Sequence, residues 1–237
     1  MIKNEKLKKI LKPAAVLTVA AGVTVGATFA FLTAQTDKVK NTFTPSGDIK
    51  IELKEPHFEQ TGEASHFAPG SVIPKDPTVD IPIDSSQNEY VASTISYYAD
   101  KNGDGVYSDD EKVSYSDFVN TYAHVYFLNG AEVSDKSLAF NNEWTTTDDF
   151  VYYYTNSSDV ADLKVMNKGE KSEIFDKVIV NKDIPTYTSD TSKYTKGTPV
   201  AFKIDVKAYG VQDSVDKATA KKALDLLIEG KDPNSVL

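Results

Sequence analysis

The amino-acid sequence predicts a mainly β protein in which a single sandwich domain occupies residues 47–237. The 237 residues include thirteen Tyr and eleven Phe, and Val, Ile and Thr are also frequent. These residue types favour strands over helices, because they pack well on a pleated surface. A chain of about 200 residues, as remains without an N-terminal leader, is long enough to bury one hydrophobic core.

Strands are expected where apolar and polar residues alternate between turn signals. Residues 48–53 show this pattern clearly, because isoleucine or leucine occupies every second position. Residues 78–83 are apolar enough for a strand, but nearby prolines restrict it to a sheet edge or a bulge. Residues 55–70 are polar and interrupted by proline and glycine, so a loop is expected there. The remaining expected strands span 90–98, 123–128, 150–154, 177–180 and 200–209.

Two segments instead show the spacing of helices. Residues 114–122 and about 214–229 carry apolar side chains at intervals of three and four positions. Asp213 or Ser214 would cap the second helix, and Gly230 would end it. We expect both to be short peripheral helices packed on the sandwich. A membrane or partner-binding role for the C-terminal helix is the alternative, but its polar face is mixed in charge rather than basic.

The first residues have the layout of a secretory signal peptide. Residues 1–12 contain five lysines and one glutamate, and the uncharged stretch 13–36 follows. The small-residue exit Thr28-Phe29-Ala30 predicts that a signal peptidase cleaves after Ala30 and removes residues 1–30. We therefore expect a secreted protein with no stable membrane span after cleavage. A retained anchor is the alternative, because the stretch is just long enough to span a bilayer.

Composition narrows the possible partners. Loss of residues 1–30 removes five Lys and one Glu, which shifts the formal net charge from −9 to −13. So acidic a protein repels phosphate, and nucleic acid is not an expected partner. No arginine occurs, so the guanidinium fork suited to phosphate and carboxylate groups is missing. The absence of cysteine excludes disulfides and thiolate metal sites.

The most specific chemical motif lies in residues 100–111, which read D-K-N-G-D-G-V-Y-S-D-D-E. They match the EF-hand pattern D-x-[DN]-x-[DN]-G-x₅-E, in which alternate oxygens converge on a calcium ion. Gly105 permits the sharp turn of such a loop. The expected calcium ligands are Asp100, Asn102, Asp104, the Val106 carbonyl, Ser108 and a bidentate Glu111.

The segment before this loop is strand-like rather than helical. We therefore expect a calcium loop inserted into a β-domain, with a helix only on its exit side. A calcium sensor needs two helices that open a groove, so a structural calcium site is the better interpretation. The alternative is a solvated turn between two strands, which Asn, Asp and Gly also favour.

Other candidate sites carry weaker signals. The three histidines are His57, His66 and His124, and the sequence has neither an H-E-x-x-H zinc motif nor a G-x-S-x-G nucleophile motif. Trp144 and the aromatic run 150–154 would suit a carbohydrate platform. An aromatic core strand is the simpler interpretation, because alternate residues of the run would face inward.

Five sequence blocks, in family order, resemble the TasA/camelysin family. The first block is GATFAFLTAQTDKVKNTFTPSGDIKIEL, at 26–53, and the others are FAPGSVIPKDPTV, WTTTDDFVYYY, KGEKSEIFDKVIV and FKIDVKAYGVQ, at 67–79, 144–154, 168–180 and 202–212. The resemblance implies trimming by a dedicated signal peptidase of the SipW type and a jelly-roll-like β-sandwich. It also implies self-association into cell-surface or biofilm-matrix fibres. The loop 100–111 lies outside these blocks, as an insertion would.

For the structural function, the resemblance implies that a freed N-terminal segment adds as a strand to the next subunit. Residues 31–46 suit this role, because they combine a few large apolar residues with many Thr, Lys and Asn. Such a segment is too polar to form a core alone, yet it would gain hydrogen bonds on an exposed sheet edge. It would alternatively pair within its own domain as an ordinary first strand.

The second function that the resemblance implies is a camelysin-like cell-envelope metalloendopeptidase. This reaction needs a catalytic metal with an open position and a general base. Only His57, Glu59, His66 and His124 offer such groups, and their spacing matches no metallopeptidase motif. We therefore expect a secreted structural subunit rather than an enzyme.

Overall fold

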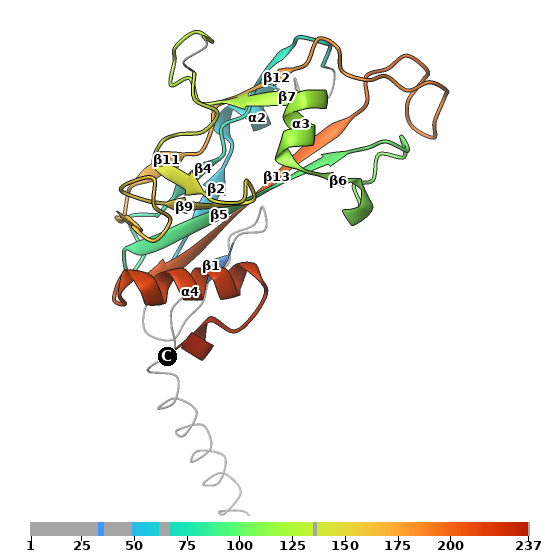
Figure 1. The fold of residues 1–237 in the computed structure, drawn as a ribbon. Coiled ribbons are helices and arrows are strands. Elements are labelled where there is room, and N and C mark those ends of the chain that lie inside the picture. Colours follow the sequence, from blue (N-terminus) through green and yellow to red (C-terminus); the bar gives the residue numbers. More distant parts are fainter. Residues whose placement is uncertain (1–32, 36–48, 62–66, 135–136, 237) are drawn as a thin grey trace, which may run out of the picture.

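The computed structural model describes residues 33–35, 49–61, 67–134 and 137–236 (Figure 1). The predicted leader 1–30, most of the segment 31–46, and His66 lie outside the described residues. The protein is mainly β, as predicted, and its strands form three antiparallel sheets.

The largest sheet is built on two long strands, β5 (Glu89–Ala99) and β13 (Phe202–Gln212), of eleven residues each. They pair along their whole length, from Phe202 opposite Ala99 to Gln212 opposite Glu89. Shorter strands extend this pair into a seven-stranded sheet of order β1-β13-β5-β9-β8, with β6 and β10 also paired to β5. These strands are β1 (Thr33–Gln35), β9 (Val151–Tyr154), β8 (Trp144–Thr146), β6 (Lys112–Val113) and β10 (Val165–Met166).

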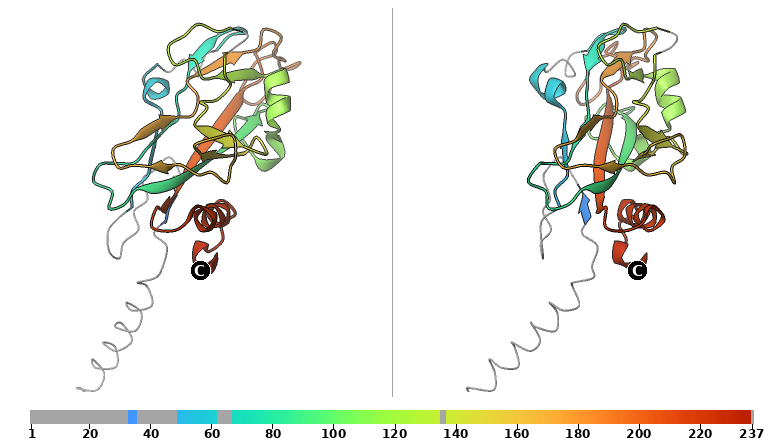
Figure 2. Two further views of the ribbon diagram at one scale, coloured as in Figure 1. Left: turned by 60° about the vertical axis from the view of Figure 1, so that its left-hand side comes forward. Right: turned by 90° about the vertical axis from the view of Figure 1, so that its left-hand side faces the viewer.

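Two three-stranded sheets share a hydrophobic core with one face of the large sheet (Figure 2). One has the order β11-β4-β2 and the other the order β3-β12-β7. Their strands are β11 (Lys171–Glu173), β4 (Thr78–Asp80), β2 (Glu52–Lys54), β3 (Val72–Pro74), β12 (Lys177–Val180) and β7 (Ala123–Tyr126). Ile49 and Ile51, expected on the buried face of a strand, are fully buried just before β2.

The opposite face of the large sheet is covered by helix α4 (Lys217–Ile228) (Figures 1 and 2). Ala220, Ala223 and Leu224 of this helix are buried in a second apolar cluster with residues of β5, β9 and β13. The prediction that the helix packs on the sheet is confirmed, but the predicted N-cap residue is wrong. Asp216, rather than Asp213 or Ser214, accepts hydrogen bonds from the Ala218 and Thr219 amides.

The other helices are short. Helix α3 (Tyr115–Thr121) forms where it was predicted, with Ser114 as its N-cap. Helix α2 (Pro56–Thr61) lies in the segment predicted as a loop, and Pro56 at its first position needs no amide partner. Single 3₁₀ turns span Asp109–Glu111 (η3) and Pro233–Val236 (η4). No helix in the described part of the chain is both long and apolar enough to cross a bilayer.

Burial on both faces explains the aromatic run in β9. Tyr152 and Tyr154 lie in the main core, whereas Tyr153 packs in the second cluster beneath α4. Trp144 is also buried, and its indole Nε1 donates to the Ser172 hydroxyl at 2.9 Å. The interpretation of these residues as core is therefore confirmed, and it extends to both faces of the strand because α4 covers the second one.

A buried carboxyl group marks the first residue of β5. Glu89 has no exposed surface, its Oε1 lies 3.4 Å from the Ser85 hydroxyl, and its Oε2 has no hydrogen-bond partner. A Cβ atom at position 210 would collide with that Oε2, so β13 needs Gly210 there. Burial raises the pKa of Glu89 to about 8.

This carboxyl group predicts a stability that falls with rising pH. Between about pH 4.5 and pH 8, Glu89 is protonated in the folded state and ionised in the unfolded state, so unfolding releases a proton. Glu89→Gln removes this proton release. Urea unfolding at pH 5 and pH 8 should therefore show a smaller loss of stability in the variant than in the wild type. The difference should be a few kcal/mol, at about 1.4 kcal/mol per pKa unit.

Glu132→Gln, at an exposed carboxylate, is the matched control and should keep the wild-type dependence on pH. Equal pH slopes for the wild type and Glu89→Gln would show that Glu89 does not titrate in this range.

Candidate metal centre

The loop 100–111 joins two strands that are neighbours in the large sheet. Asp100 follows the last residue of β5 and is fully buried, and its amide donates to the Ala201 carbonyl at 2.8 Å. Glu111, at the far end of the loop, is 5% exposed. It immediately precedes β6, which pairs back onto β5 at Tyr97 and Tyr98. Both ends of the loop are therefore anchored on the same strand.

The Asp100 carboxylate organises the first half of the loop. Its Oδ1 accepts from the Gly103 amide at 2.7 Å and the Asp104 amide at 3.1 Å, and its Oδ2 accepts from the Gly105 amide at 2.8 Å. Gly103 and Gly105 have φ of 71° and 77°, which glycine adopts without steric cost. The two glycines thus wrap the backbone around the carboxylate.

Local hydrogen bonds also hold the other predicted side-chain ligands of the loop. Asn102 accepts from the Asp104 amide at 2.9 Å and donates to Asp104 Oδ2 at 3.1 Å, and Asp104 Oδ1 accepts from the Val106 amide at 2.7 Å. Ser108 donates to Glu111 Oε2 through its hydroxyl at 3.2 Å and its amide at 3.3 Å. Val106 is exposed, and because its side chain has no donor atom, only its carbonyl is a possible ligand.

Three of the predicted ligands converge. One carboxylate oxygen from each of Asp100, Asp104 and Glu111 lies within 4.8 Å of the other two. The second oxygen of Glu111, Oε1, is buried and has no hydrogen-bond partner. Three carboxylates in such proximity repel one another, and a buried oxygen without a partner is costly. This donor set of carboxylate, amide, hydroxyl and carbonyl oxygens has the chemistry that hard divalent cations prefer.

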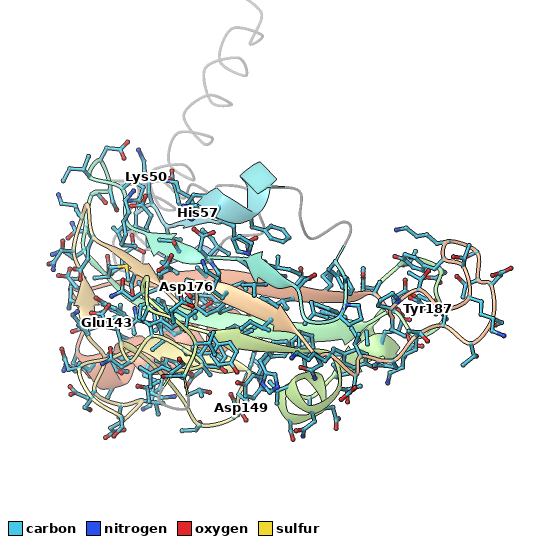
Figure 3. The ribbon with its side chains drawn as sticks, turned by 90° about the horizontal axis from the view of Figure 1, so that it is seen from above. Lys50, His57, Glu143, Asp149, Asp176 and Tyr187 are labelled. Carbon is cyan, nitrogen blue, oxygen red and sulfur yellow. The ribbon has the colours of Figure 1, made fainter. Side chains whose placement is uncertain are left out.

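A second segment, the hairpin 186–199, packs against the loop (Figure 3). The Tyr187 hydroxyl donates to the Asp100 carbonyl at 2.7 Å and accepts from the Ala201 amide at 3.3 Å. The Thr191 hydroxyl donates to the Gly103 carbonyl at 2.8 Å. Tyr187 and Tyr194 stack with ring centroids 5.1 Å apart. Sequence reasoning missed this contact, and its only signal was a segment rich in Ser, Thr and Asp.

The two histidines among the described residues do not join the carboxylate cluster. His57 Nδ1 lies 2.7 Å from Asp76 Oδ2, and the His124 ring lies 6.0 Å from the ring of Tyr126. Among the described residues, the only cluster with three or more possible metal-binding side chains is that of Asp100, Asp104 and Glu111.

Comparisons with protein-family models and with curated proteins found no match to this chain. The resemblance to the TasA/camelysin family rests on the five sequence blocks quoted above.

The hydroxyl of Tyr187 links the hairpin to the start of the loop. Tyr187→Phe leaves the buried Ala201 amide and the Asp100 carbonyl without this partner, which typically costs about 1–3 kcal/mol. Tyr194→Phe is the matched control, because the Tyr194 hydroxyl forms no hydrogen bond within the described residues and the ring stack is kept. Thermal melts should show a lower midpoint for Tyr187→Phe only, and equal midpoints would contradict the assigned link.

Proposed function

We propose that this chain is a secreted structural subunit of cell-surface or biofilm-matrix fibres, which assemble by strand addition and are stabilised by a calcium ion. In this proposal the three sheets form a jelly-roll-like sandwich. The single observation that carries the proposal is that, among the described residues, only the three-residue strand β1 pairs with β13 on the side away from β5.

Within the described ranges, only β1 pairs with this second edge of β13. Thr33, Ala34 and Gln35 lie opposite Val211, Gly210 and Tyr209, at the end of the eleven-residue strand. An edge strand offers amide and carbonyl groups to any further strand, and proteins usually protect such edges. Within the described residues, the first half of β13, residues 202–206, offers such an edge, which supports an assembly role.

A groove lies beside that first half. Phe202, Lys203 and Ile204 line a pocket of about 120 Å³ together with Phe58, Phe67, Ile73, Lys75 and Val178. A strand added at an edge gains backbone hydrogen bonds, and pockets for alternate side chains give it specificity. Val39 and Phe43 of the segment 31–46 are large apolar residues that an apolar groove of this kind would accept.

The short β1 pairing is compatible with exchange between subunits. Strand β1 belongs to the segment 31–46, and in the structure its three residues pair with β13 of the same chain. So short a strand contributes few hydrogen bonds, so the same edge can accept the segment of a second copy at similar cost.

A shortened chain that begins at Gly47 tests strand addition. If residues 31–46 are donated to a neighbour, the shortened chain should remain folded in a thermal melt and form no fibres by electron microscopy. A synthetic peptide of residues 31–46 should then bind the shortened chain and raise its melting temperature. The control peptide carries Val39→Asp and Phe43→Asp and should have no effect.

The shortened chain would instead unfold if residues 31–46 belong to the core of their own domain. If Val39 and Phe43 fill the core of their own domain, their loss would cost several kcal/mol, as for other large buried side chains. An unfolded shortened chain would therefore overturn the donor-strand mechanism.

The calcium part of the proposal is supported by the geometry of the loop 100–111. Three carboxylates converge there, and the unpartnered Glu111 Oε1 offers the second oxygen of a bidentate ligand. Asn102, Ser108 and the Val106 carbonyl would complete the shell. Because strands rather than two helices flank the loop, we assign the ion a structural role.

Calcium should stabilise the protein with the modest affinity of extracellular modules, a Kd of about 10⁻⁴ to 10⁻³ M. At a calcium concentration ten times Kd, the gain in unfolding free energy should be about 1.4 kcal/mol. Calorimetric titration and thermal melts with calcium chloride measure the two quantities. Glu111→Gln should abolish both responses while preserving the shape of the side chain.

Asp109→Asn is the matched control, because this exposed residue lies in the same loop but at no ligand position of the pattern. It should respond to calcium as the wild type does. An unchanged calcium response in Glu111→Gln would show that the loop is not the binding site.

A further inference from the structure

The hairpin 186–199 buries very little of its own surface. Among its residues only Tyr187 is fully buried, and the half-buried Tyr194 stacks on it. Inside the hairpin, the Tyr187 amide donates to the Thr198 carbonyl at 2.9 Å. The Tyr187 hydroxyl reaches out of the hairpin to the Asp100 carbonyl at 2.7 Å (Figure 3). A segment with so few buried contacts opens at a low cost in free energy unless a neighbouring element holds it.

Three further donors of the hairpin converge on one carbonyl group of the loop 100–111. The Gly103 carbonyl accepts from the Thr191 hydroxyl at 2.8 Å and from the Ser192 hydroxyl at 3.2 Å. It also accepts from the Lys193 amide at 3.2 Å. The hairpin is therefore docked through backbone carbonyls of the loop, which stay in place only while the loop keeps its shape.

The hairpin also packs directly on the two glycines of the loop. A Cβ atom at Gly103 would lie 2.5 Å from the Thr191 side chain, and one at Gly105 would lie 2.5 Å from the Lys193 ammonium. The amides of the same two glycines donate to the Asp100 carboxylate at 2.7 and 2.8 Å. The surface on which the hairpin docks is thus shaped by one of the proposed calcium ligands.

The loop keeps this shape at an electrostatic cost when it holds no cation. Carboxylate oxygens of Asp100, Asp104 and Glu111 lie within 4.8 Å of one another, and the buried Glu111 Oε1 has no hydrogen-bond partner. Like charges at this separation repel one another. Opening of the loop relieves the repulsion, but it moves the Gly103 carbonyl away from the donors of the hairpin. A cation that closes the loop therefore also stabilises the docked hairpin.

Two exposed lysines, Lys193 and Lys196, lie in the hairpin. In the docked hairpin, the Lys193 amide is bonded to Gly103, and the Lys196 amide donates to Asp190 Oδ1 at 2.8 Å. These bonds keep the backbone folded back, whereas a protease needs an extended segment in its cleft. Exposed tips with small polar residues are preferred sites of proteolytic cleavage. The undocked hairpin meets both requirements, and the docked hairpin does not.

We propose that the hairpin 186–199 is a cleavage site for lysine-specific proteases and that calcium in the loop 100–111 controls access to it. With the ion bound, the hairpin stays docked. Without the ion it opens, and the protease adds water across the peptide bond after Lys193 or Lys196, which leaves a carboxylate on the lysine and an amine on the next residue. This inference rests on the calcium ion of the proposed function, but it does not depend on fibre assembly.

Limited proteolysis of the full chain with a lysine-specific endoproteinase that needs no calcium tests this control. Mass spectrometry should show fast cleavage after Lys193 and Lys196 with a chelator and slower cleavage with calcium chloride. At a calcium concentration ten times Kd, cleavage should slow by about tenfold, because the ion binds the docked form. Cleavage after the exposed Lys231, beyond α4 at the opposite end of the molecule (Figure 1), is the internal control and should not change.

Thr191→Val removes the hydroxyl that reaches Gly103 and keeps the shape of the side chain. At saturating calcium its hairpin should be cut about three to ten times faster than that of the wild type, as expected for one lost hydrogen bond. Its calcium Kd, measured by calorimetry, should rise in parallel, because the coupling between docking and binding is reciprocal. A residue that only stiffened the hairpin would leave the Kd unchanged.

Two matched controls should behave as the wild type in both measurements. Thr191→Ser keeps the hydroxyl, and Thr195→Val removes a hydroxyl that is paired with Thr198 inside the hairpin at 3.2 Å. Glu111→Gln, which removes a proposed calcium ligand, should be cut at the same rate with and without calcium.

The outcomes separate this inference from the calcium site itself. Calcium binding in calorimetry without slower cleavage after Lys193 and Lys196 would overturn the control of access and leave the calcium site in place. Equal protection after Lys231 would also overturn it, because calcium would then stabilise the whole fold rather than the hairpin. A complete lack of calcium binding would overturn the calcium site and the control of access together.

Discussion

The continuous pairing of β5 with β13 is the interaction on which the rest of the structure depends. One face of the pair packs on the main core with the two smaller sheets, and α4 covers the end of the other face around Tyr90, Ala92 and Tyr209. The shorter strands β6, β9 and β10 all take their positions from β5. This one pair of strands therefore positions the segments that form the candidate sites.

The proposed calcium site and the proposed docking groove both lie at one end of this pair of strands. At the end where Ala99 pairs with Phe202, the Asp100 amide bonds to the Ala201 carbonyl and the Tyr107 hydroxyl lies 3.4 Å from the Phe202 carbonyl. The groove proposed for an added strand begins at that same Phe202. A cation in the loop 100–111 would thus order the first residues of β13, where a neighbour's strand would dock. Calcium and assembly are coupled in this proposal by shared backbone contacts.

Local sequence patterns predicted the elements in which apolar residues recur at regular spacing. Alternation found β5, β9, β12 and β13, and the spacing of Phe118 and its neighbours found α3 with its Ser114 cap. The motif of residues 100–111 brought three of its acidic ligands together as expected. The elements that the sequence did not predict depend on tertiary contacts. Helix α2 forms in a polar segment whose Phe58 packs on the main core, and the hairpin 186–199 binds the loop through hydroxyl-to-carbonyl bonds that leave no periodic signal.

Buried polar atoms without partners reveal a further regularity. Apart from Ser86, the described residues with such an atom lie on or next to β5, since Glu89 and Tyr97 belong to β5, Tyr152 to the neighbouring β9, and Glu111 ends the loop that leaves β5. A strand buried on both faces has no water to satisfy such groups, so each needs its own chemical solution. For Glu89 the solution is a retained proton, as its raised pKa indicates. For the crowded carboxylates around Glu111 we propose a cation. One constraint, burial along β5, therefore leads to different chemical solutions at Glu89 and at the loop 100–111.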